Sequence, residues 1–269
     1  MHLIAVDLDG TLLRSDKTVS ERTAEALRQA RARGFTVVPV TARPPRFLRR
    51  VALDCEIFDM AICCNGALVF DVPGETIIEH HALEPADALR IVALLREALP
   101  DICFAAEMGL RYGWDSRYAS LPGALLDPDG ILAEVDGLLT EPVTKLIARH
   151  PSLAFELLLE SARALAMEDC EITHSSTEFI EISRRGVDKA AALIAFTARL
   201  GLSPSDVIAF GDMPNDLPML RWAGHSIAVA NAHPDVLSTV DAVTASNDED
   251  GVAVMLERML QLSPSRPSR

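Results

Sequence analysis

The sequence contains few cysteines, and none of them has the spacing of a metal site. Its 269 residues include five cysteines, an odd number, with no pair separated by two residues. Cys63 and Cys64 lie in an apolar run, which favours buried small side chains over disulfides or zinc ligands. The seven histidines are scattered along the chain. A metal site built from cysteine and histidine is therefore not expected.

Two further absences bear on location and partners. No apolar run approaches about 18 residues, and no basic segment followed by a long apolar one opens the chain, so neither a membrane helix nor a secretion signal is predicted. Lysine and arginine total 25 against 39 aspartates and glutamates, a formal net charge of −14. This balance argues against nucleic acid and anionic membranes as partners. We expect a cytoplasmic protein that is a monomer or a homodimer.

The chain has the composition and length of a globular protein with two domains of ordinary size. It is 49% hydrophobic and 24% charged. In its first part, helical patterns alternate with apolar runs typical of strands buried on both faces of a parallel sheet. These strands are predicted at Leu3–Val6, Phe35–Val40 and Met60–Cys64, and a helix containing Val51 is predicted to begin at Pro44-Pro45.

The pattern changes after Asn65-Gly66 and returns near Asp188. A hairpin is predicted around Pro73-Gly74, followed by short strands and helices in mixed order, including a helix near Ile131–Leu139. We therefore predict an α/β protein with a Rossmann-like parallel-sheet core at 1–82 and 185–262. An α+β domain is inserted at 83–184, and residues 263–269 are expected to form a disordered tail.

Acidic residues follow two of the predicted strands. Asp7 and Asp9 come after the first strand, and Asp212 and Asp216 come after Val207–Phe210. Ligands of an open parallel sheet bind outside the carboxyl ends of its strands. Thr41 follows another strand, and Lys189 begins the helix after the inserted domain. A hydroxyl, a lysine and several carboxylates at one sheet edge suit Mg²⁺ and a phosphoryl group.

Each of these residues also has an ordinary explanation when it is taken alone. Asp9-Gly10 is compatible with a tight turn, and Thr41 with the cap of the following helix. Lys189 fits a solvated helix residue, and Asp212 and Asp216 fit turn and capping positions. These explanations become weak together, because all the residues fall at strand ends in the order that a single site requires.

The motifs resemble those of the haloacid dehalogenase superfamily, specifically Cof-type phosphatases with a class IIB cap. The segment Asp7–Leu12 matches the family's DxDGTL motif, which is its most specific element. Further matches are Thr41-Ala42-Arg43, Asn65-Gly66-Ala67, Gly186–Lys189, Gly211–Asp216 and Asn247–Ala253. Ala42 stands where the family usually has glycine, and Met213-Pro214 replaces a common polar pair.

The resemblance implies hydrolysis of small phosphorylated metabolites, such as sugar phosphates, through an aspartyl-phosphate intermediate and with Mg²⁺ as cofactor. It assigns catalysis to Asp7 as nucleophile, Asp9 as acid and base, Thr41 and Lys189. It assigns phosphate or substrate binding to Leu8, Gly10, Ala42, Arg43, Asn65 and Asn215. It assigns the metal to Asp7, Asp9 through its main-chain carbonyl, Asp212, and Asp216 either as a ligand or behind the ligands.

The same resemblance gives the inserted domain the task of contacting the leaving group and selecting substrates. Arg43, Asn65, Arg184 and Arg185 lie near its ends. Two alternative functions remain open from the sequence. One is a phosphomutase of the same superfamily, and the other is a non-catalytic protein that binds a phosphoryl ligand on this scaffold.

Overall fold

The computed structural model describes residues 2–48, 57–165 and 167–261. Val51 of the predicted helix, Cys55 and the predicted tail 263–269 lie outside the described residues. The chain forms two compact units, 1–78 with 188–269 and 79–187. The expected domain boundaries, 83 and 184, lie a few residues inside the second unit. None of the described helices combines the length and the apolar character needed to cross a membrane.

The first unit is built on a parallel sheet whose strand order changes direction between two neighbouring strands. Its order is β14 (Ala242–Val243), β13 (His225–Ala228), β12 (Val207–Gly211), β1 (His2–Val6), β2 (Phe35–Pro39). A single parallel bridge between Val40 and Ile62 links β2 to β3 (Met60–Cys63). When only these six parallel strands are counted along the chain, their order is 3-2-1-4-5-6, with the switch point between β1 and β12.

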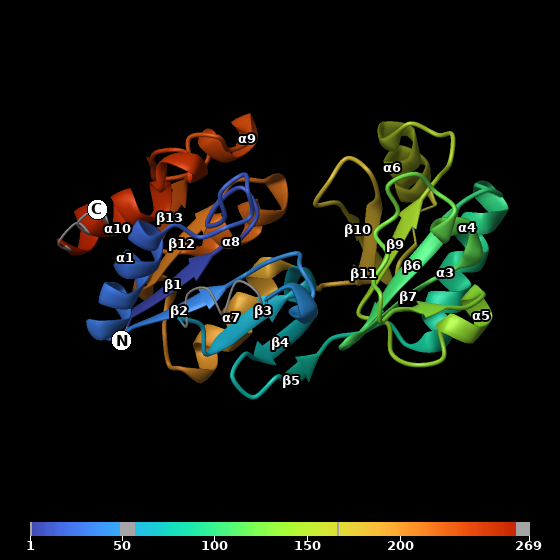
Figure 1. Cartoon of the computed structure of the whole chain (residues 1–269), viewed down its shortest axis with the longest axis horizontal. Coiled ribbons are helices and arrows are strands. Elements are labelled where there is room, and N and C mark those ends of the chain that lie inside the picture. Colours follow the sequence, from blue (N-terminus) through green and yellow to red (C-terminus); the bar gives the residue numbers. More distant parts are fainter. Residues whose placement is uncertain (1, 49–56, 166, 262–269) are drawn as a thin grey trace. The chain divides into compact units, whose positions relative to one another are not determined.

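Helices cover both faces of this sheet (Figure 1). α1 (Glu21–Ala32) contacts α10 (Gly251–Leu260), and in Figure 1 these two lie on the opposite face from α7 (Lys189–Arg199) and α8 (Leu217–Trp222). α1 begins where the Ser20 side chain accepts a hydrogen bond from the amide of Thr23. Leu3 and Ala5 pack with α7 and α8. The residues that alternate with them, Ile4 and Val6, are also fully buried. This explains the uninterrupted apolar runs, because both faces of each strand are covered.

A smaller sheet and several short segments complete the first unit. The sheet has the order β3, β4 (Leu68–Asp71), β5 (Thr76–His80), with β3 and β4 antiparallel. The short elements are η1 (Cys64–Gly66), η2 (Pro204–Asp206), η3 (Pro214–Asp216), α9 (Pro234–Leu237) and η4 (Asn247–Glu249), and residues 45–48 are helical. The hairpin predicted around Pro73-Gly74 is therefore confirmed, as is a helix beginning at Pro45.

The second unit is a six-stranded sheet with helices packed on it. Its order is β10 (Cys170–Thr173), β11 (Ile180–Arg184), β9 (Lys145–Arg149), β6 (Cys103–Met108), β7 (Arg111–Trp114), β8 (Ile131–Leu132). α3 (Pro85–Ala98), α5 (Val135–Leu138) and α6 (Phe155–Ala164) share one hydrophobic core with the sheet. Tyr118 of α4 (Ser116–Ala119) packs in a separate cluster with Tyr112 and Trp114. Both units thus combine strands and helices as predicted, and the α/β fold with an α+β insertion is confirmed.

Candidate active site

Three carboxylates meet at the switch point of the parallel sheet. The amide of Asp7 donates to the carbonyl of Phe210 at 3.0 Å, so the pairing of β1 with β12 places Asp7 beside the loop that carries Asp212. One oxygen from each of Asp7, Asp212 and Asp216 lies within 4.8 Å of the other two. We call these three residues the acidic cluster. Asp216 is fully buried, whereas Asp7 and Asp212 each remain 6% exposed.

A buried lysine joins two members of the acidic cluster. The Lys189 ammonium donates to Oδ1 of Asp7 at 2.5 Å and to Oδ1 of Asp216 at 2.6 Å. Lys189 is the first residue of α7, whose preceding residue Asp188 accepts a hydrogen bond from the amide of Ala191. Gly66 packs against this helix start, since a Cβ atom there would lie 2.3 Å from the Asp188 carbonyl oxygen. The site therefore brings together two strands and a helix that are distant in sequence.

Asp216 has its carboxylate occupied by three donors. Its Oδ1 accepts from Lys189, and its Oδ2 accepts from the amides of Asp212 and Met213, each at 3.0 Å. These bonds hold the loop after β12 in a tight turn and fix the ammonium of Lys189. Of the two roles that the sequence left open for Asp216, this geometry favours the supporting one over direct metal ligation.

The charge balance of the acidic cluster favours a bound cation. Burial raises the pKa of Asp7 well above its ordinary value, although the charge of Lys189 opposes this. Burial, followed by the charge of Asp216, raises the pKa of Asp212 to about 6. Burial lowers the pKa of Lys189, but the charges of Asp216 and Asp7 prevail and raise it. Three carboxylates against one ammonium leave excess negative charge, and hard oxygen donors of this kind suit Mg²⁺.

The side chain of Asp9 lies outside the acidic cluster. Its Oδ2 accepts from Nε of Arg43 at 2.5 Å and its Oδ1 from Nη2 at 2.6 Å, while Lys17 Nζ lies 3.0 Å from Oδ1. Burial raises the pKa of Asp9, but hydrogen bonding and charge from Arg43 and Lys17 outweigh it and lower that pKa. The two aspartates of the first motif therefore occupy different electrostatic environments.

Thr41 and two asparagines lie in loops of the same unit. The buried Thr41 hydroxyl accepts a hydrogen bond from the amide of Arg43 at 3.1 Å, which leaves its own proton available to a ligand. The Asn215 side chain donates to Oδ1 of Asn65 at 3.2 Å. Asn65 adopts a left-handed backbone with φ of 55°. This asparagine pair connects the loop after β3 with the loop after β12.

The backbone around Asp7 and Asp9 is tightly constrained. Gly10 has φ of 79°, and a Cβ atom there would lie 2.5 Å from Oδ2 of Asp212. Leu8 is fully buried, and its carbonyl accepts from the amide of Leu13 at 2.8 Å. Glycine at position 10 thus permits close approach to the carboxylate of Asp212. Ala42 lies in the loop between Thr41 and Arg43.

Three side chains that support the site were not assigned a role from the sequence. The Thr11 hydroxyl donates to Oδ1 of Asp212 at 2.7 Å. The Asn231 side chain donates to the Gly10 carbonyl at 2.8 Å and accepts from the amide of Asn247 at 2.9 Å. Asn247 in turn donates to the Leu13 carbonyl at 2.9 Å. Thr11 belonged to a quoted motif, whereas no local spacing marks Asn231.

The sequence as a whole matches a known family. The sequence model of haloacid dehalogenase-like hydrolases matches residues 4–256. The chain belongs to this family. This confirms the resemblance to Cof-type phosphatases of the superfamily.

Several curated relatives of this haloacid dehalogenase-like hydrolase are named as phosphatases. The 5-amino-6-(5-phospho-D-ribitylamino)uracil phosphatase YcsE of Bacillus subtilis is 31% identical over 253 residues, covering 94% of this chain and 93% of that protein. The pyridoxal phosphate phosphatase YbhA of Escherichia coli is 28% identical over 272 residues, covering 94% and 96%. The prediction of a phosphatase, a phosphoric monoester hydrolase, is confirmed.

Solved structures of other proteins share the fold. SMU.1108c from Streptococcus mutans has a TM-score of 0.85 at 25% identity, covering 97% of this chain and all 100% of that one. The subclass IIB sugar phosphatase BT4131 has a TM-score of 0.80 at 23% identity, with coverage of 97% and 100%. The expected fold, a parallel-sheet core with an inserted α+β domain, is therefore confirmed.

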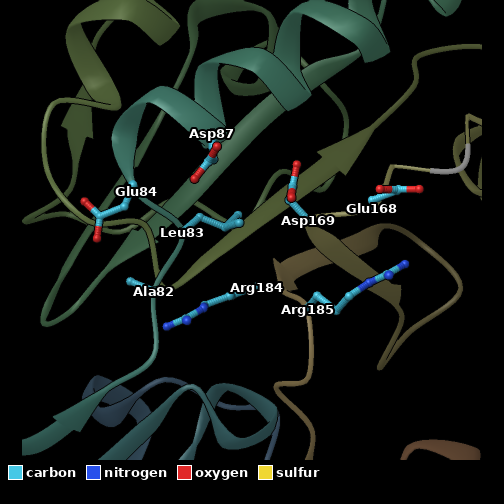
Figure 2. Close-up of a pocket in the computed structure, with 8 residues that line it drawn as sticks. All are labelled: Ala82, Leu83, Glu84, Asp87, Glu168, Asp169, Arg184 and Arg185. Atoms are coloured by element: carbon cyan, nitrogen blue, oxygen red, sulfur yellow. The ribbon is translucent and has the colours of Figure 1, made fainter.

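The second unit of this haloacid dehalogenase-like hydrolase contains a pocket of about 460 Å³ (Figure 2). Arg184 and Arg185 line it, and Figure 2 shows their guanidinium groups pointing in different directions. Four carboxylates also line it, and one of them, Asp169, pairs with Arg90. The two arginines therefore do not converge on a single anion position. They were noted from the sequence only for lying near the end of the inserted segment.

Proposed function

We propose that the protein is a Mg²⁺-dependent hydrolase of small phosphomonoesters that works through an aspartyl-phosphate on Asp7. The observation that carries this proposal is the buried contact, at 2.5 Å, between Lys189 and Asp7 of the acidic cluster. A lysine fixed in this way orients one carboxylate oxygen and neutralises charge as a phosphoryl group arrives. The other carboxylate oxygen of Asp7 is the attacking atom.

The proposed cation site consists of the carboxylates of Asp7 and Asp212 and the main-chain carbonyl of Asp9. Asp216 holds Lys189 and the loop behind these ligands. When bound, Mg²⁺ supplies positive charge that stabilises the phosphoryl oxygens in the transition state. The raised pKa of Asp212 supports a site that is completed by a cation.

In the first step, an Asp7 oxygen forms a bond to phosphorus while the bond from phosphorus to the leaving oxygen breaks. Asp9 in its protonated form gives its proton to that leaving oxygen. In the second step, a water oxygen forms a bond to phosphorus while the bond from phosphorus to the Asp7 oxygen breaks. Asp9 takes a proton from the water, inorganic phosphate is released, and the carboxylate of Asp7 is restored. Arg43 lowers the pKa of Asp9 and so keeps it ionised, as the base of the second step requires. Because the first step needs Asp9 protonated, Arg43 must loosen its contact with Asp9 for that step.

The remaining loops would hold the transferred phosphoryl group. Thr41 would donate its hydroxyl proton, since that oxygen already accepts from the amide of Arg43. Asn215 and Asn65 would approach from the two loops that their mutual hydrogen bond connects. The backbone segments around Leu8, Gly10 and Ala42 complete the proposed set of phosphate contacts.

The substrates are proposed to be small phosphorylated metabolites. YcsE and YbhA are named for small phosphate esters that contain a nitrogen heterocycle, uracil in one and pyridoxal in the other. These names support a metabolite-sized substrate for this chain. We also propose that the second unit selects among substrates, with a cytoplasmic location and a monomeric or homodimeric state.

The test is a phosphate-release screen of the purified protein over many phosphomonoesters, with and without Mg²⁺. We expect inorganic phosphate to appear only when Mg²⁺ is present. Release without any acceptor also separates hydrolysis from a mutase, which returns the phosphoryl group to its substrate. An absence of release from every ester would contradict the proposed function.

A further inference from the structure

A partly exposed aromatic ring contacts two arginines close to the active site. Phe47 is 45% exposed although it is a large apolar side chain. The guanidinium carbons of Arg43 and Arg46 lie 5.8 Å and 4.8 Å from the centre of its ring. The next residue, Leu48, is buried, so the helix that begins at Pro45 is anchored while it presents Phe47 outward. We call Phe47, Arg43 and Arg46 the Phe47 platform.

The Phe47 platform is joined directly to the residue assigned to leaving-group protonation. Arg43 contacts the Asp9 carboxylate through two nitrogens, at 2.5 Å and 2.6 Å. The Asp9 carboxylate marks the position of the leaving oxygen in the proposed mechanism. Parts of the leaving group that extend beyond this oxygen toward Arg43 would therefore reach the ring of Phe47.

The chemistry of the Phe47 platform suits one kind of leaving group. An exposed phenyl ring stacks on flat rings, and guanidinium groups both stack on such rings and donate hydrogen bonds in their plane. A flexible polyol has no flat face and gains little from stacking. A heteroaromatic ring with carbonyl or hydroxyl oxygens at its edge can stack on the phenyl ring and accept hydrogen bonds from the guanidinium groups at the same time.

We propose that the Phe47 platform recognises a planar heteroaromatic ring in the alcohol part of the substrate. This inference rests on the proposed function, since it locates the leaving group by the role of Asp9. Phe47 acts as a specificity-determining residue, and it has no part in the bond-making steps. The substrate class is therefore a primary phosphomonoester that carries an oxygen-substituted nitrogen heterocycle.

The test compares two primary alkyl phosphates, pyridoxine 5′-phosphate and glycerol 3-phosphate, which place similar demands on Asp9. We expect Phe47→Ala to lower kcat/KM for the pyridoxine ester by about three- to tenfold, mainly through KM, as stacking energies predict. The glycerol ester should change by less than about twofold. Phe47→Tyr keeps an aromatic ring and should retain the preference. Equal losses on both esters in Phe47→Ala would overturn the inference.

A binding measurement keeps the inference testable if neither ester is hydrolysed. Calorimetry of the Asp7→Asn variant should show tighter binding of pyridoxine 5′-phosphate than of glycerol 3-phosphate. Adding Phe47→Ala to that variant should remove the difference, while the thermal midpoint stays unchanged because Phe47 is exposed. Equal binding of the two esters to Asp7→Asn would overturn the inference. Failure of the proposed function is recognised separately, by the absence of phosphate release from every ester in the broader screen.

Discussion

Lys189 and Asp7 form a buried ion pair with 2.5 Å between Nζ and Oδ1, although 182 positions separate them in the sequence. Burial of an ion pair is costly unless further hydrogen bonds compensate for the lost water. Asp216 provides one such bond to Lys189 at 2.6 Å. The pair holds a carboxylate in one orientation at the edge of the sheet, as a nucleophile requires.

The first prediction concerns Lys189. We expect Lys189→Ala to reduce kcat by on the order of 10²-fold or more, because a preorganised charge at the phosphoryl group is lost. Circular dichroism should show the native secondary structure. Arg28→Ala, which changes a half-exposed residue of α1, serves as the control and should keep the parent kcat. A Lys189→Ala enzyme with the parent turnover number would show that the ion pair is only structural.

The second prediction concerns the dependence on metal and pH. Asp212 has a pKa of about 6 in the metal-free protein, raised from 3.8, so it is protonated below pH 6 and must lose that proton to bind a cation. Mg²⁺ should therefore raise the thermal midpoint more at pH 7.5 than at pH 5, and chelation should abolish activity. Asp212→Asn should remove most of this stabilisation. Full activity after exhaustive chelation would rule out the metal site.

The raised pKa of Asp212 also determines how stability without metal depends on pH. Between 3.8 and about 6, the folded state binds more protons at Asp212 than the unfolded state does. The contribution of Asp212 to the free energy of unfolding is therefore greatest below pH 3.8 and is lost as the pH rises through 6. Comparison of the parent with Asp212→Asn in urea, without metal, isolates this contribution. A pH dependence of the opposite sign would show that Asp212 has a lowered pKa.

The third prediction concerns Asp9. We expect Asp9→Asn to lower kcat by roughly 10²- to 10⁴-fold on alkyl phosphates, because proton transfer to the leaving oxygen is lost. The loss in the first step should be smaller for acyl or aryl phosphates, whose leaving groups depart without a proton. Burst kinetics on both classes measure this. Equal losses of the first step on the two classes would mean that Asp9 does not protonate the leaving group.

The fourth prediction concerns the second unit. Its hydrophobic core contains no residue of the core around β1 and β12, so each unit has its own packing. Replacement of residues 79–187 by a short flexible linker should leave Mg²⁺ binding intact and change the ranking of substrates, so that only the preference supplied by the Phe47 platform remains. Calorimetry with Mg²⁺ and a substrate panel measure the two effects. If the shortened protein kept the parent's substrate ranking, the second unit would have no part in substrate selection.

The strands around the site could be predicted because their signals are local. Each strand of the parallel sheet is covered on both faces, so its residues form an unbroken apolar run, as in Leu3–Val6. The helix predicted near Ile131–Leu139 is wrong in its first part. Ile131 and Leu132 form β8 and pair with Gly113 and Trp114 of β7, and only Val135–Leu138 is helical. A two-residue strand depends on its partner, and β7 itself has no clear pattern in the sequence.

The site was predictable in its residues and less so in their contacts. The positions of Asp7, Lys189 and Asp212 at the ends of predicted strands and at a helix start predict that these residues lie together. The pairing of Asp9 with Arg43 and Lys17 was not predicted, because it depends on how two loops approach each other. The support of Gly10 by Asn231 was missed for the same reason, since 221 positions separate these residues.

The central claim is that Asp7 carries the phosphoryl group during turnover. The most direct measurement is rapid quenching of Asp9→Asn during reaction with an acyl phosphate and Mg²⁺, followed by mass spectrometry of the peptide that contains Asp7. Slow hydrolysis of the intermediate should let it accumulate, so we predict a phosphoryl group on Asp7 and none when Asp7→Asn is added. Phosphate released by Asp9→Asn with no adduct at any time, or an adduct on another residue, would contradict the account.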